Sequence, residues 1–173
     1  MNYDSRKTNS FSSFSSNNKH RDEKSISYGD KVETDKLIIR YIKGEMVTME
    51  EQYDIFKLDG LIANKYCLKG SNDIRMNQLR KFYDEIVSIY DDYENNKANE
   101  SKLIRLVPVA RYAFARDLID MKLLQLISDG VEIISKEKDI NRKEECLRNF
   151  RNLMEAIIAY SKESKEEKRR NQK

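Results

Sequence analysis

Residues 103–116 read LIRLVPVARYAFAR, and their spacing predicts an α-helix with two different faces. At about 100° per residue, apolar residues gather on one side of this helix, and cations with an aromatic ring gather on the other. The apolar side consists of Leu103, Leu106, Val107, Ala110 and Phe114, and the opposite side carries Arg105, Tyr112 and Arg116. The first set suits a hydrophobic core, so the second set needs an explanation outside the core.

Pro108 interrupts this helical pattern. Proline has no amide hydrogen and its ring crowds the carbonyl four residues earlier, so Pro108 either starts the helix or bends it. A bend would turn the outer face into a shallow groove. Arg105, Tyr112 and Arg116 follow one another along that face at spacings of seven and four residues.

The composition of the whole chain favours helices. Its 173 residues suit one domain, and 36% of them are charged, with one proline, five glycines and no tryptophan. The N-terminus shows no signal segment, and no apolar run approaches the roughly 20 residues that cross a bilayer. We expect an all-α, cytoplasmic protein that does not enter a membrane.

Further helices are predicted on both sides of the opening stretch. A capping box at Thr48 and Glu51 starts a helix over about 49–68, with Gly70 as its stop. The next helix begins after Asn72 or at Asn77; we prefer Asn77, since an early start would turn Arg75 toward the apolar side. Downstream, one helix is predicted over 118–136, where Gly130 lowers helix stability, and another over 141–163, which has a continuous apolar stripe.

The two ends of the chain lack such patterns. Residues 1–32 are rich in Ser and Asn and predict a disordered arm, and 164–173 predict a frayed, charged, flexible tail. Within 33–163, the segment near residue 38 suits a short helix that stops at Gly44, although 36–42 would also suit a strand. The prediction is a compact five-helix bundle, with a sixth short helix at its N-terminus as the variant.

The net charge of +3 comes from the ends of the chain. Residues 161–173 hold six Lys/Arg against three Glu (+3), and residues 1–30 hold five against four (+1), which leaves −1 for 31–160. A nearly neutral domain has no broad attraction for nucleic acid. Any such affinity must come from cations placed on one face.

Catalytic and metal-binding patterns are missing from the sequence. The single histidine, His20, lies in the arm, which removes the common triads and zinc sites from the folded part. The isolated glycines form no phosphate loop, and Cys67 and Cys146 suit buried free thiols in a reducing compartment. We expect a non-enzyme with no cofactor, no metal and no small-molecule substrate.

Arginines around a tyrosine suit a polyanion, because guanidinium groups bind phosphate oxygens in pairs and tyrosine offers a stacking surface or a hydroxyl. Two alternatives remain: Arg111 or Arg116 pairs with a carboxylate such as Glu155, or Tyr112 packs between helices. The residues that this pattern gives as candidate phosphate contacts are Lys102, Arg105, Arg111, Tyr112, Arg116 and Lys122.

Three segments together resemble the small subunit of the type III-A CRISPR effector, the Csm complex. They are NQLRKFYDEI (77–86), LVPVARYAFAR (106–116) and FRNLMEAIIAYSK (150–162), and the resemblance covers about 50–162. The family has Ser or Thr where Asn77 stands. The matching positions are Gln78, Leu79 and Arg80; Pro108, Tyr112 and Arg116; and Glu155, Ala156, Ala159 and Tyr160.

The resemblance implies a helical bundle that stacks with copies of itself, beside the backbone and large subunits of an antiviral ribonucleoprotein. It implies a non-catalytic lining that holds guide RNA and target RNA by their sugar-phosphate backbones. Through the resemblance, the candidate phosphate contacts become candidate RNA contacts, and Arg80 joins them. Glu155 and Tyr160 carry over as helix-packing residues. The alternatives are a stand-alone helical DNA-binding regulator, for which the chain offers no clear helix-turn-helix, and a protein-only helical scaffold.

Overall fold

The computed structural model describes residues 36–45, 47–57, 60–67 and 73–171. Every regular element in these ranges is a helix, which confirms the all-α prediction. The predicted arm at 1–32 and the predicted stop at Gly70 lie outside the described residues. After a helical segment at 36–42 come α2 (Met49–Phe56), α3 (Leu61–Lys65), α4 (Asp73–Glu94), α5 (Glu100–Ala115), α6 (Met121–Lys136) and α7 (Ile140–Asn171).

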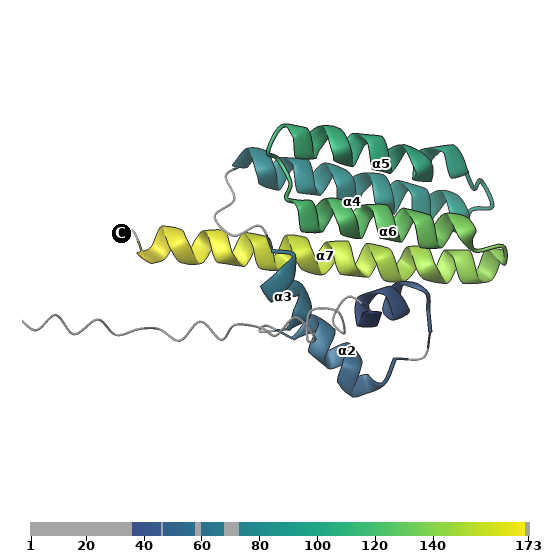
Figure 1. Cartoon of the computed structure of the whole chain (residues 1–173), viewed down its shortest axis with the longest axis horizontal. Helices are drawn as coiled ribbons and strands as arrows, with labels where there is room; N and C mark the ends of the chain where they lie inside the picture. The colour runs from purple at the N-terminus through teal and green to yellow at the C-terminus, as the bar shows by residue number, and fades with distance from the viewer. Residues whose placement is uncertain (1–35, 46, 58–59, 68–72, 172–173) are drawn as a thin grey trace, which may run out of the picture.

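Four long helices form the main bundle (Figure 1). Helix α4 packs on α7 and α5 packs on α6, while α4–α5 and α6–α7 contacts complete the bundle. The segment 36–42, α2 and α3 lie on the other side of α7, which therefore contacts both parts of the molecule. No helix in the described part of the chain is long and apolar enough to cross a membrane.

The core consists of the apolar stripes that the sequence predicts. Phe82 of α4, Leu103 of α5 and Phe150 of α7 are all buried. Each such side chain contributes about 1.5–3 kcal/mol by leaving water. Cys67 and Cys146 are buried free thiols, as predicted, and burial raises the pKa of the Cys146 thiol, which keeps it in its unreactive protonated form.

The segment 36–42 is a helix, and the alternative of a strand is wrong. It ends as predicted at Gly44, which has a left-handed φ of 64°. The amides of Gly44 and Glu45 donate to the carbonyls of Tyr41 and Arg40, both at 3.1 Å, which is the pattern of a Schellman C-cap. A side chain at Gly44 would also meet the Glu145 carboxyl carbon at 2.8 Å.

The capping box that starts α2 is confirmed, but the single helix over 49–68 is wrong. The Thr48 hydroxyl accepts from the Glu51 amide at 3.1 Å, and the Glu51 carboxylate accepts from the Thr48 amide at 2.9 Å. The helix is interrupted at Gly60, where an added Cβ would lie 2.6 Å from the Asp54 carbonyl and 2.7 Å from that of Lys57. Only glycine allows this close approach of backbone to backbone.

Helix α4 begins at Asp73, so the predicted start at Asn77 is wrong. The early start brings Met76 into the core at 4% exposure. Arg75 lies half-buried at the border of the apolar side, where its Nε donates to the Asp117 carbonyl at 2.9 Å. Arg75, which argued against an early start, therefore has a hydrogen-bond partner in the turn between α5 and α6.

Helix α7 extends to Asn171, beyond the predicted end near residue 163. Residues 162–171 are mostly Lys, Glu and Arg, which have high helix propensity and can continue a helix without core contacts. Nearer the bundle, the Tyr160 hydroxyl donates to the Phe56 carbonyl. This hydrogen bond ties α7 to α2.

Candidate nucleic-acid interface

Helix α5 carries most of the candidate RNA contacts and forms one edge of the bundle (Figure 1). Its N-cap is Asn99, whose side-chain oxygen accepts from the Ser101 amide at 3.1 Å. The helix runs from there through Pro108 to Ala115, so a helix that starts at Pro108 is excluded. Pro108 and Ile104 are both exposed, so the helical hydrogen bond that proline cannot make is missing on the solvent-facing side of α5.

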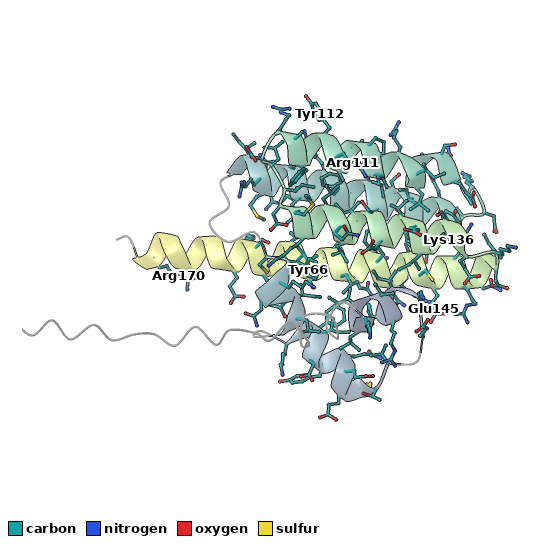
Figure 2. The ribbon with its side chains drawn as sticks, viewed as in Figure 1. Tyr66, Arg111, Tyr112, Lys136, Glu145 and Arg170 are labelled. Carbon is teal, nitrogen blue, oxygen red and sulfur yellow. The ribbon has the colours of Figure 1, made fainter. Side chains whose placement is uncertain are left out.

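The outward side of α5 combines cations, an aromatic ring and aliphatic groups. We call this set the outer α5 face. Tyr112 is 64% exposed, which excludes its packing between helices, and Figure 2 shows it projecting from the edge of the bundle. The members of the face, all exposed, are Ile104, Arg105, Pro108, Val109, Arg111, Tyr112 and Arg116.

Tyr112 and Arg116 form a pair on this face. The guanidinium carbon of Arg116 lies 5.4 Å from the centroid of the Tyr112 ring, which is a cation–π distance. Nη1 of Arg116 also donates to the Tyr112 hydroxyl at 3.4 Å. Helical side chains lean toward the N-terminus, so a residue four positions later reaches back over the ring. The two groups present adjacent planar surfaces to solvent.

Arg105 has a carboxylate partner on α4, but the contact is loose. Its Nη2 lies 3.9 Å from Glu85 Oε2, and the two side chains are 65% and 50% exposed. Exposed pairs of this kind contribute about 0–1 kcal/mol and are screened by salt. A phosphate can therefore take the place of Glu85.

Lys102 is held more firmly than Arg105. Its Nζ lies 2.5 Å from Asp92 Oδ2, with only 37% of the lysine side chain exposed. This contact directs the ammonium group toward α4 and away from the outer α5 face. Lys102 is the candidate whose charge is most fully neutralised within the protein.

Arg111 and Arg116 have no such partner. Among the residues that the structure describes, no carboxylate lies within 4.0 Å of either guanidinium. Glu155 lies instead at the α4–α7 contact, where burial and then the Glu155 carboxylate raise the pKa of Tyr83. The alternative in which Glu155 neutralises Arg111 or Arg116 is therefore wrong.

Lys122 and Arg80 are exposed but differ in their position. Lys122 is the second residue of α6, just after the N-cap Asp120, whose carboxylate accepts from the Leu123 amide at 2.9 Å. The turn before it is fixed by the hydrogen bond from Arg75 to Asp117. This turn connects Lys122 to the end of α5 that carries Arg116.

Arg80 does not join the outer α5 face. On α4, Glu85 and Asp92 pair with residues of α5, while Tyr90 lies beneath the Arg151 guanidinium of α7 at 4.5 Å. Arg80 is about 140° around the helix from Glu85, and about 60° from Tyr83, which lies beside Glu155 of α7. It therefore lies toward α7, on a different side of the bundle from Arg105.

A groove of about 600 Å³ runs between α4 and α5. Phe82 and Leu106 form its apolar base, and its rim carries Lys81, Glu85 and Arg105. Glu85 and the exposed Ile104 and Val109 were not predicted from the sequence, because the pattern of one helix does not show which residues its neighbour contributes. The described residues contain no group of His, Cys, Asp and Glu side chains suited to a metal ion.

A family model matches a large part of the chain. Residues 54–167, more than half of the chain, match the family model described as Csm2 Type III-A. That range contains α4, α5 and α6 in full and most of α7. No curated protein and no solved structure matches the chain.

Proposed function

The chain belongs to the Csm2 family, the small subunits of type III-A CRISPR effector complexes, and we propose that its outer α5 face holds RNA within such a complex. The family is one of structural subunits, which assemble with the other subunits of the effector. The proposed contacts are sequence-independent and go to the sugar-phosphate backbones of guide RNA and target RNA. Arg105, Arg111 and Arg116 supply the main charges, with Lys122 beside them.

One observation carries this proposal: Arg111 and Arg116 are exposed on the same helix as Tyr112 and have no carboxylate within ion-pair distance among the described residues. Cations left unpaired by the protein itself are available to an external anion. Guanidinium groups bind phosphate in pairs of hydrogen bonds, and most protein–nucleic acid contacts of this kind carry no sequence information.

The proposal includes stacking of copies of this subunit beside the backbone and large subunits, in antiviral defence. A face with three arginines and one loose ion pair binds RNA weakly on its own. Repeated copies along one RNA would raise the effective concentration of each face. Lys102 contributes less than Arg105, because Asp92 already holds its ammonium group.

The test uses the assembled complex with Arg105→Ala and Arg116→Ala combined in this subunit. RNA affinity should fall. The slope of log affinity against log salt concentration should become shallower by roughly 0.7 for each lost phosphate contact. The matched control combines Lys36→Ala and Lys138→Ala, which removes two exposed cations outside α5. Unchanged affinity across the salt titration, with helix content intact by circular dichroism, would contradict the proposal.

A second experiment tests the assembly itself. A tagged full-length chain purified from its native cell should bring small guide RNAs and the large and backbone subunits with it. Recovery of the chain with neither RNA nor the other subunits would argue against a place in the effector.

A further inference from the structure

We propose that Tyr112 stacks on an unpaired nucleobase, so that the outer α5 face binds single-stranded RNA in preference to duplex. The inference rests on the proposed RNA-binding function of this face. It specifies that the preferred ligand is single-stranded RNA and that Tyr112 is the residue responsible for this preference. Phosphate contacts alone, from Arg105 and Arg111, would not distinguish the two states.

The exposure of the Tyr112 ring is the first support. At 64% exposure the ring contributes little to the core, and it stands among the aliphatic Ile104, Pro108 and Val109, which are also exposed. Exposed apolar side chains are common singly, whereas several of them on one side of one helix are a feature of binding surfaces. Figure 2 shows the side chain projecting away from the bundle, with no other helix beyond it.

The neighbouring arginine is the second support. The Arg116 guanidinium lies 5.4 Å from the ring centroid and donates to the ring hydroxyl at 3.4 Å, which limits the orientations of both side chains. Nucleobases stack on aromatic rings and on guanidinium planes alike. A ring that is already oriented loses less conformational entropy when a base stacks on it.

The position of the cations along α5 is the third support. Arg105 is seven residues before Tyr112, which is about 10 Å along the helix axis, and Arg116 is four residues after it. A strand that follows the helix can place a phosphate at each arginine with a base over the ring between them. In a duplex the base faces are stacked on one another and the ring has nothing to contact.

The chain contains a matched control for this pair. Tyr53 of α2 is 67% exposed, and the ammonium group of Lys57, four residues later, lies 5.7 Å from its ring centroid. This second tyrosine–cation pair therefore has the same spacing and a similar exposure. It lies in the part of the molecule on the other side of α7 from α5.

The experiment measures binding of the full-length chain, at low salt, to one short fluorescent RNA as a single strand and as a duplex. Tyr112→Leu should weaken single-strand binding roughly tenfold, the usual effect of removing one stacking ring, and should leave duplex binding unchanged. Tyr112→Phe should retain the wild-type affinity, because the ring remains. Tyr53→Leu should match the wild type in both assays.

A fluorescent adenine analogue within the single strand reports the stacking directly. Its emission should be quenched by the wild type and by Tyr112→Phe, and should recover with Tyr112→Leu. Equal loss on single strand and duplex, or equal loss with Tyr53→Leu, would overturn the stacking inference while leaving RNA binding in place. Absence of salt-dependent binding to either RNA, by the chain alone and by the assembled complex, would overturn the proposed function, and this inference with it.

Discussion

The Phe150 ring of α7 lies directly against Gly130 of α6, so close that a methyl group at position 130 would come within 2.7 Å of ring atom Cε2. Phe150 is fully buried. The sequence alone presents Gly130 as a weak point inside a helix, since glycine costs about 1 kcal/mol there relative to alanine. In the structure, the missing side chain allows α6 and α7 to pack closely around the Phe150 ring.

Gly130→Ala should therefore destabilise the protein despite the better helix propensity of alanine. Overpacking of a dense core costs about 1–3 kcal/mol and the gain in propensity is about 1 kcal/mol, so we expect a net loss of up to about 2 kcal/mol. Urea unfolding measures this difference. Adding Phe150→Leu should recover part of the loss by making space for the new methyl group. A Gly130→Ala protein more stable than the wild type would contradict the packing argument.

Stability should fall at alkaline pH because of buried tyrosines, with Tyr66 as the main contributor. Burial, and then the carboxylates of Asp129 and Asp120, raise the pKa of Tyr66 above its ordinary value of about 10. Above pH 10 the unfolded chain releases this proton and the folded chain keeps it, so the free energy of unfolding decreases as pH rises. Below pH 10 this effect should be absent.

Urea unfolding at pH 8 and at pH 11 tests the effect. Tyr66→Phe should show a smaller decrease between the two pH values than the wild type. Tyr53→Phe, at an exposed position, is the control and should show the wild-type decrease. An equal pH dependence for Tyr66→Phe and the wild type would assign the alkaline loss to other groups.

Glu85→Gln should strengthen RNA binding. The Glu85 carboxylate lies 3.9 Å from Arg105 and must give way when a phosphate binds there. Removing its charge frees the guanidinium, and we expect a gain of roughly two- to fivefold at low salt, since exposed pairs contribute at most about 1 kcal/mol. Glu132→Gln on α6, whose carboxylate pairs with Lys136, changes the net charge equally and is the control. An equal gain in both variants would show that the effect comes from net charge and not from the contact with Arg105.

The core of the fold was predictable where it depends only on the spacing of residues within one helix. The apolar stripes of α5, α6 and α7 predict the buried residues, because spacing along one helix determines which side chains share a face. The break at Gly60 was not predictable in this way, since it depends on carbonyls of residues 54 and 57 that approach the glycine only in the folded turn. The early start of α4 depends on a carbonyl 42 residues away from Arg75.

The candidate site was likewise predictable only in part. Exposure of Arg105, Tyr112 and Arg116 follows from the helical wheel and is present in the structure. The partners Asp92 and Glu85, which distinguish Lys102 from Arg105, come from a neighbouring helix and have no signal within 103–116. Arg80 is separated from the others because α4 turns it toward α7.

The most direct test of the account is ultraviolet crosslinking of the assembled complex that carries its unpaired guide RNA, followed by mass spectrometry of this subunit. Trypsin cuts after Arg111 and Arg116, so Tyr112 lies in the short peptide 112–116. The account predicts RNA adducts on this peptide and on its neighbour 106–111. Adducts confined to α2, α3 or α6, with 106–116 unmodified, would contradict it.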